Sequence, residues 1–303
     1  MTGPAIVVRG LVKTYAGRRV VADLDLDVEC GEVFALLGLN GAGKTTTTEI
    51  MEGYRARDAG EVSVLGADPG RPPAGWRARI GIVLQSVNDL GELTVAEVLR
   101  HFAVYYPDPR DPDEVIDRIG LGDKRSSRTR QLSGGQRRRL DVGLGILGRP
   151  ELLFLDEPTT GFDPEARRQF WDLITDLAAE GTTILLTTHY LDEAEQLADR
   201  LGVIAAGRLL DVGTPATLGG RDEDETVVSW RDPEGVRTLA TAEPTRVVAE
   251  LAARFGGEVP GLSVARPTLE DVYLRMIARA EPLPAVAVKA PTSHALVLQG
   301  GPR

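Results

Sequence analysis

The residues best suited to chemistry form a glycine-rich segment near the start of the chain. Residues 38–45 read GLNGAGKT and match the pattern G-x-x-x-x-G-K-[ST] of a phosphate-binding loop. Glycines let backbone N–H groups approach phosphate oxygens without a Cβ atom in the way. The ammonium of Lys44 can reach the outer phosphates, and the hydroxyl of Thr45 can bind Mg²⁺. The spacing therefore predicts a site for a nucleoside triphosphate rather than a turn that binds nothing.

Two adjacent carboxylates, Asp156 and Glu157, follow an apolar segment that reads LLFL at residues 152–155. At the carboxyl end of a parallel strand such side chains lie beside a nucleotide crevice, and successive residues point to different sides. We expect Asp156 to face Mg²⁺ and Glu157 to polarise or deprotonate a water molecule that attacks the γ-phosphate. The alternative is a charged pair at a strand end, which is common on any surface.

A second candidate anion site is the segment LSGGQ at residues 132–136, which precedes a predicted helix. The turn offers the hydroxyl of Ser133 and the free N–H groups of a helix N-terminus, and both suit a phosphate. Taken alone, the segment is explained equally well as a helix N-cap made by Ser133.

Three single residues carry weaker signals. Gln85 ends an apolar strand, where its amide can reach the metal or water, or instead cap a loop. His189 follows another strand and can donate to the γ-phosphate and orient Glu157, although a lone histidine there is more often a polar strand end. Tyr15 precedes Gly17 in an expected loop, where its ring can stack on an adenine face or pack on the domain.

These residues need a framework, and the hydrophobic pattern predicts one of alternating strands and helices. Apolar runs favour strands at residues 5–9, 20–28, 33–37, 60–65, 80–84, 152–155, 182–187, 201–205 and 226–230. Helical periodicity favours helices at residues 44–54, 94–122 with a break at prolines, 136–147, 165–180, 191–200, 244–255 and 268–279. The alternation predicts an α/β fold with a largely parallel core sheet.

Composition limits the class of protein. The 303 residues are 42% hydrophobic and 26% charged, which is ordinary for a globular chain. The formal charge of −10 argues against a general attraction to nucleic acid. Cys30 is the only cysteine, which excludes an intrachain disulfide and a cysteine-built metal site. No apolar run approaches the ~18–20 residues that cross a bilayer, and the N-terminus lacks a signal-peptide pattern, so we expect a cytoplasmic chain.

The chain is expected to have three parts. Residues 1–220 form the nucleotide-binding domain, with a helical subdomain at about 86–148. A polar segment reading GGRDEDET, at residues 219–226, marks the start of a small accessory domain at 224–280. Residues 281–303 contain four prolines and little periodicity, which indicates a flexible tail.

Together these segments resemble the nucleotide-binding subunit of ATP-binding cassette (ABC) transporters, over roughly residues 5–220. The segment LSGGQ is that family's own signature. The Walker A segment is matched by Gly38, Leu39, Asn40, Gly41, Ala42, Gly43, Lys44, Thr45 and Thr46. Gln85 resembles the Q-loop glutamine, and His189 resembles the switch histidine. Asp156 and Glu157 resemble the Walker B aspartate and the catalytic glutamate, Asp163 falls in the D-loop, and Tyr15 falls at the adenine-stacking position.

The resemblance implies an ABC ATPase core of the P-loop NTPase type. That core has a mostly parallel sheet, an antiparallel β edge, a helical subdomain and a small α+β C-terminal extension. The resemblance also implies a head-to-tail homodimer in the ATP-bound state, which encloses two ATP molecules with Mg²⁺. The residues implied to act in trans on the partner's nucleotide are Ser133, Gly134, Gly135, Gln136 and Asp163. The implied metal ligands are Thr45, Gln85 and Asp156, the last directly or through water.

The same resemblance implies a separate integral membrane permease that places the chain on the cytoplasmic face of the cell membrane, and no nucleic-acid partner. Residues 226–280, with the run PTLEDVY at 267–273, resemble the daunorubicin-resistance-like branch, which exports drugs, lipids or other amphipathic molecules. The competing hypothesis is a soluble cassette ATPase that acts on ribosomes or DNA. Such chains usually carry two P-loops or a long coiled coil, and this sequence shows neither.

Two basic clusters flank the signature segment. Lys124, Arg125, Arg128 and Arg130 precede it, and Arg137, Arg138 and Arg139 follow it. They can add positive potential near ATP or contact a partner. Charge runs of this kind usually form a solvated face, and we expect one here.

Overall fold

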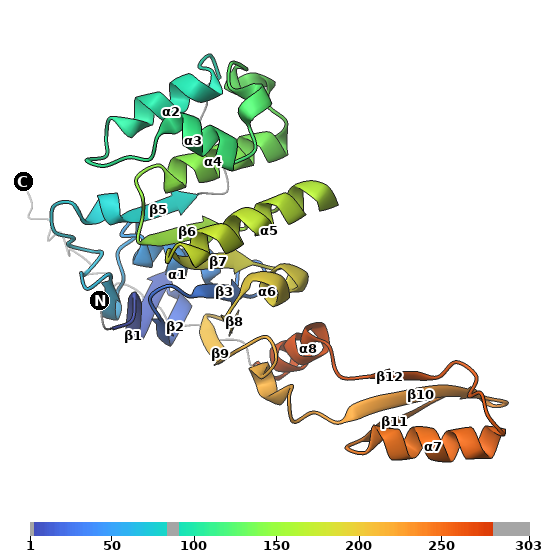
Figure 1. Cartoon of the computed structure of the whole chain (residues 1–303). Coiled ribbons are helices and arrows are strands. Elements are labelled where there is room, and N and C mark those ends of the chain that lie inside the picture. The colour runs from blue at the N-terminus through green and yellow to red at the C-terminus, as the bar shows by residue number, and fades with distance from the viewer. Residues whose placement is uncertain (1–2, 84–90, 281–303) are drawn as a thin grey trace, which may run out of the picture.

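A six-stranded sheet forms the centre of the computed structural model, which describes residues 3–83 and 91–280 (Figure 1). Its strand order is β5-β6-β7-β3-β8-β9. The strands are β3 Val33–Leu37, β5 Ile80–Val83, β6 Leu152–Asp156, β7 Thr183–Thr188, β8 Arg200–Ala205 and β9 Arg208–Gly213. The first five strands in this order run parallel, and β9 pairs antiparallel with β8 at the edge. The predicted α/β fold with a mostly parallel sheet is confirmed.

The strands of this sheet are apolar on both faces because each face packs against a different layer. Phe34, Phe154 and Leu185 belong to one buried cluster, whereas Ala35 and Leu155 belong to the other. Residues that alternate along a strand point to opposite faces, so a strand covered on both sides reads as a continuous apolar run. This double burial explains why the short central strands were predictable from sequence.

An antiparallel sheet with strand order β2-β1-β4 covers one face together with helix α1. These elements are β1 Ile6–Tyr15, β2 Arg18–Val28, β4 Ala59–Val64 and α1 Lys44–Met51. The helix ends at Met51 rather than near Tyr54, because Gly53 turns the chain with a φ of 74°. Tyr15 is the last residue of β1 rather than part of a loop.

The other face carries the remaining helices of the main body (Figure 1). They are α2 Val95–Ala103, α3 Pro112–Arg118, α4 Gly134–Ile146, α5 Pro164–Ala179 and α6 Leu191–Leu197, with short 3₁₀ turns at Gly122–Lys124, Thr129–Gln131 and Leu218–Gly220. A further 3₁₀ turn, Trp76–Arg79, packs Trp76 into the cluster on the opposite face. Helix α6 stops at Leu197, before the predicted end, because Arg200 already belongs to β8. No helix in the described ranges is long and apolar enough to cross a membrane.

The C-terminal elements divide between two hydrophobic clusters. Strands β10 Thr226–Asp232, β11 Gly235–Thr241 and β12 Ser263–Ala265 form a small sheet with helix α7 Pro244–Phe255, and Figure 1 shows this unit extending away from the main body. Val228 and Leu251 lie in its own core. Helix α8 Leu269–Arg279 instead packs Leu269 and Tyr273 into the core of the main body. The proposed domain boundary at residue 224 stays a prediction.

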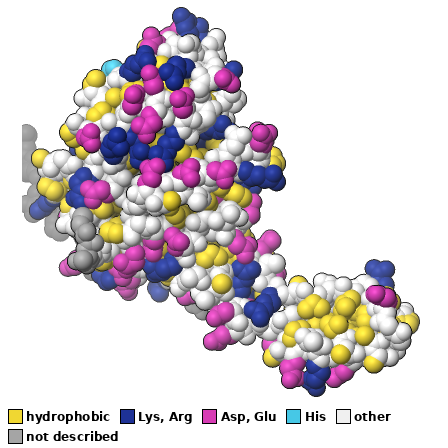
Figure 2. Space-filling model, in the orientation of Figure 1, with side chains coloured by type: hydrophobic (Ala, Val, Ile, Leu, Met, Phe, Trp, Pro, Cys, Tyr) yellow, Lys and Arg dark blue, Asp and Glu magenta, His cyan; other side chains and the backbone are white. Residues whose placement is uncertain are grey.

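Apolar side chains are also exposed on this small unit, where Figure 2 shows hydrophobic surface. The exposed large ones are Val236, Leu239, Leu262 and Val264. Strand β11 was not predicted, because residues 235–240 are all exposed and carry no alternating apolar pattern.

Helix α4 approaches the sheet through a pair of glycines. A Cβ atom added to Gly81 on β5 would lie 2.2 Å from the carbonyl oxygen of Gly145 on α4. The helix can therefore lie this close to β5 only if residue 81 has no side chain.

We predict that Gly81→Ala lowers the free energy of unfolding by about 2 kcal/mol, because the added methyl group forces the helix away from the sheet. Urea unfolding of the purified chain measures this change. Gly134→Ala is the matched control, since no atom lies within 4 Å of a Cβ at that α4 position. Equal stability of the two variants would contradict the proposed contact.

Candidate nucleotide-binding site

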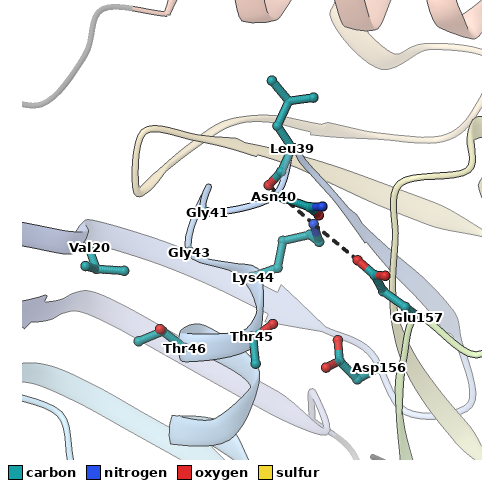
Figure 3. A pocket seen from close by; sticks show the side chains of 10 residues that line it. All are labelled: Val20, Leu39, Asn40, Gly41, Gly43, Lys44, Thr45, Thr46, Asp156 and Glu157. Atoms are coloured by element: carbon teal, nitrogen blue, oxygen red, sulfur yellow. Dashed lines mark hydrogen bonds and ion pairs between the residues drawn. The ribbon is translucent and has the colours of Figure 1, made fainter. Parts of the chain in front are cut away.

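A pocket opens where the loop between β3 and α1 faces the end of β6 (Figure 3). Its lining residues are Val20, Leu39, Asn40, Gly41, Gly43, Lys44, Thr45, Thr46, Asp156 and Glu157. The structure thus brings most of the predicted phosphate loop together with the predicted carboxylate pair, although more than 100 residues of sequence separate them.

The loop keeps its shape through close backbone contacts. Gly43 has a φ of 111°, and a Cβ there would lie 2.8 Å from the carbonyl oxygen of Val20. A Cβ on Gly38 would lie 2.5 Å from the carbonyl oxygen of Ile204 on β8. Only glycine suits these two positions, and the result is a loop that opens the N-terminus of α1 into the pocket.

The ammonium of Lys44 lies inside the loop. The side chain is buried, and Nζ donates a hydrogen bond to the carbonyl oxygen of Gly38 at 2.7 Å. Glu157 Oε1 lies 3.9 Å from the same nitrogen, as the dashed line in Figure 3 marks. Burial lowers the pKa of Lys44, and the charges of Glu157 and Asp156 oppose that change. A cation in this position suits an anionic ligand.

The carboxylate pair is fixed by the neighbouring strand β7. Thr187 Oγ1 donates a hydrogen bond to Asp156 Oδ1. The backbone N–H of Glu157 donates to the carbonyl oxygen of Thr187 at 3.0 Å. Glu157 has a φ of 44°, in the left-handed region that favours glycine, so its conformation needs this outside support. Sequence reasoning missed Thr187; the available signal was a pair of threonines at the end of a buried strand.

His189 meets Glu157 in this structure. His189 Nδ1 lies 3.3 Å from Glu157 Oε1, and the imidazole contacts the ring of Tyr190 with centroids 4.1 Å apart. The same carboxylate oxygen therefore lies near both a lysine and a histidine. This triad of Lys44, Glu157 and His189 brings together the predicted phosphate loop and two residues that were predicted to follow separate strands.

The residues present suit a magnesium ion that is shared with a nucleotide. Thr45 and Asp156 both line the pocket, and within the described ranges no three acidic, histidine or cysteine side chains cluster into a metal site. Magnesium is commonly bound by one or two carboxylates plus substrate phosphates and water, rather than by a cage of protein ligands. The predicted third ligand, Gln85, lies outside the described residues.

Tyr15 lines a second hollow next to the first. The two share Val20, Gly41 and Thr46, and the second also contains Arg18. The Tyr15 ring is flanked by two cations, with Lys13 Nζ and the Arg55 guanidinium each 5.4 Å from its centroid. The predicted base-stacking role of Tyr15 stays a prediction, and its position beside the phosphate loop supports it.

The signature segment and Asp163 do not line the pocket. Ser133 caps α4, where its hydroxyl accepts a hydrogen bond from the Gln136 N–H at 3.3 Å. Asp163 caps α5 and accepts from the Ala166 N–H at 2.8 Å. Both caps are exposed at the starts of their helices. Within one copy, these residues therefore stand apart from the phosphate loop.

A phosphate loop between a parallel strand and a helix, with an acidic pair at the end of a neighbouring strand, defines a P-loop nucleoside triphosphatase. The separate helix that begins with LSGGQ places the protein among the ATP-binding cassettes.

Comparisons with known proteins agree with this class. The sequence profile of the ABC transporter family matches residues 21–160. The daunorubicin/doxorubicin resistance ATP-binding protein DrrA of Streptomyces peucetius is 38% identical, over 90% of this chain and 92% of the relative. The Nod factor export ATP-binding protein I of Rhizobium johnstonii is 39% identical, over 91% and 95%. The chain belongs to the ATP-binding subunits of ABC transporters.

Solved structures show the same fold. An ATP-binding subunit of an ABC transporter matches with a TM-score of 0.67 and 24% identity, over 90% of this chain and 99% of that one. The cbiO1 subunit from Clostridium perfringens matches with a TM-score of 0.63 and 28% identity, over 71% and 90%. The protein is therefore a nucleotide-binding ATPase that works with a membrane partner, and the hypothesis of a soluble cassette is not supported.

A further titratable group, which sequence reasoning missed, lies behind the pocket. Glu52 follows the last turn of α1 and is 7% exposed. Burial, together with the charges of Asp156 and Glu49, raises the pKa of Glu52 to about 7. A glutamate at the end of a short helix gives no sequence signal of burial.

We predict that Glu52→Gln stabilises the protein at pH 8 by on the order of 2 kcal/mol and has little effect at pH 5. The folded-state pKa of Glu52 exceeds its unfolded value, so its contribution to stability is present below pH ~4.5 and is lost as the pH rises through 7. Thermal unfolding at both pH values measures the effect. The exposed carboxylate of Glu61 supplies the control, Glu61→Gln, and a pH-independent gain for Glu52→Gln would contradict the assignment.

Proposed function

We propose that the chain binds ATP with Mg²⁺, dimerises with a second copy in the ATP-bound state, and powers export through a separate permease at the cytoplasmic face of the membrane. The observation that carries the proposal is the position of Glu157 in the pocket of the phosphate loop. Its Oε1 atom lies 3.9 Å from Lys44 Nζ and 3.3 Å from His189 Nδ1. A carboxylate in this position is suited to act on the water that attacks a bound γ-phosphate.

In the proposed reaction each residue has one task. The N–H groups of the loop and the start of α1 bind the phosphates, and Lys44 neutralises their outer charge. Thr45 and Asp156 would hold a magnesium ion, which would supply further positive charge. Glu157 accepts a proton from water while the water oxygen bonds to the γ-phosphorus. The bond to the bridging oxygen breaks, which releases ADP and phosphate, and His189 orients Glu157 and the γ-phosphate.

The position of the signature segment supports a homodimer. Ser133, Gly134 and Asp163 are exposed and lie outside the pocket of their own chain. The N-terminus of α4 presents N–H donors that suit phosphate oxygens, as the start of α1 does. A second copy, placed head to tail, brings residues 133–136 and Asp163 to the nucleotide that the first copy binds.

The names of the relatives support export as the direction of transport. One is a resistance protein for daunorubicin and doxorubicin, and the other exports Nod factor. We extend this to a drug-like or amphipathic cargo for the present chain.

The experiment that tests the transport proposal is affinity purification of the tagged Glu157→Gln chain with ATP from detergent-solubilised membranes of its host. We expect a polytopic membrane protein at equal stoichiometry. Recovery of ribosomal or DNA-associated proteins in its place would contradict the proposal.

We predict that Glu157→Gln abolishes ATP turnover and preserves ATP-dependent dimerisation, because the amide cannot accept the proton but keeps the shape of the side chain. Phosphate release measures the first effect, and size-exclusion chromatography with light scattering measures the second. Turnover at the parental rate would show that Glu157 is not the base.

A further inference from the structure

One arginine of the basic run after the signature segment is buried rather than solvated. Arg138 lies in the second turn of α4 and is 8% exposed. Its neighbours in the run behave differently: Arg137 donates to the carbonyl oxygen of Thr129, and Arg139 donates to Gln169 Oε1 at 2.6 Å. The prediction of a solvated face for the whole run is wrong for Arg138.

The guanidinium of Arg138 reaches the segment that carries Glu157. Its Nε donates to the carbonyl oxygen of Pro158 at 3.2 Å, and its Nη2 donates to the carbonyl oxygen of Asp156 at 2.5 Å. These two carbonyls belong to the residues on either side of Glu157. A planar guanidinium presents several N–H donors in a fixed arrangement, so it can bind two carbonyls at once.

The contact with Arg138 stabilises an unfavourable backbone conformation at Glu157. Glu157 adopts a positive φ, which is disfavoured for a residue with a Cβ and persists only where the surroundings impose it. Strand β7 fixes one side through the bond from the Glu157 N–H to Thr187. Arg138 binds the two flanking carbonyls, so the segment is supported from both β7 and α4.

Acidic groups partly offset the burial of this guanidinium. Burial lowers the pKa of Arg138, and the charges of Asp141, Asp156 and Glu193 oppose the change. Glu193 is fully buried at the start of α6, and Asp141 lies one turn further along α4. The guanidinium that binds the segment around Glu157 is therefore buried in the neighbourhood of three acidic residues.

We propose that Arg138 is a positioning residue for Glu157, which sets the direction of the carboxylate by binding the carbonyls on both sides of it. The proposal rests on the proposed role of Glu157 as the base. Since Arg138 does not line the nucleotide pocket, its loss should slow the chemical step without weakening the binding of ATP.

The test compares Arg138→Met, which has no donors, with Arg138→Gln, which keeps one amide group. Each full-length variant is purified with its membrane partner from detergent-solubilised host membranes. We expect kcat to fall on the order of 100-fold for Met and less for Gln, with the KM for ATP within about threefold of the parent. Arg139→Met, on the same helix, is the matched control and should keep kcat within about twofold.

A double variant separates positioning from general stability. If Arg138 acts through Glu157, adding Arg138→Met to Glu157→Gln should not lower the residual single-turnover rate further. Thermal unfolding shows which variants are folded. If Arg138→Met is not folded, Arg138→Gln replaces it in the double variant.

Two kinds of failure can be told apart. A folded Arg138→Met or Arg138→Gln with parental kcat, or with a loss of ATP affinity as large as its loss of kcat, overturns the inference alone. A Glu157→Gln variant with the parental rate overturns the proposed function, and the inference falls with it.

Discussion

The site depends on hydrogen bonds that join the end of β6, and the residue after it, to the neighbouring parallel strand β7. Thr187 on β7 accepts from the backbone of Glu157 and donates to the side chain of Asp156. These bonds let the chain leave β6 in a conformation that a glutamate does not adopt by itself. Because β3 pairs with the other edge of β7, the phosphate loop that follows β3 is set against the same strand. Strand β7 thus positions both the Asp156–Glu157 pair and the phosphate loop.

Helix α4 carries both the signature residues and Arg138, which contacts the segment around Glu157. Its first turn carries the signature residues, and its second turn carries Arg138, bonded to the segment around Glu157. The close glycine contact with β5 fixes the helix against the sheet. The signature glycines and Arg138 lie within the first two turns of one helix. In the proposed dimer, the helix that would meet a partner's nucleotide would also support Glu157, the proposed base, in its own chain.

Sequence alone predicted the parts of the site that are local in the chain. The phosphate loop, residues 152–157 and the short buried strands have patterns that arise within a few residues. It could not predict Arg138, Thr187 or Glu52 as members of the site, because their roles come from contacts between segments that are far apart in the chain. Strand β11 was not predicted for a different reason. Its residues 235–240 are exposed, so its sequence has no alternation of buried and exposed side chains. Gln85 and residues 281–303 lie outside the described residues.

The balance of charge explains why the pocket needs positive partners from several sources. Lys44 is a buried cation that faces Asp156 and Glu157, and the buried carboxyl of Glu52 lies behind them. A triphosphate adds further negative charge to this group, so one ammonium cannot balance it. Helix starts, which carry partial positive charge, contribute without the desolvation cost of another buried ion. We propose that a divalent cation balances the remaining charge, which fits a pocket lining that offers the hydroxyl of Thr45 and the carboxylate of Asp156.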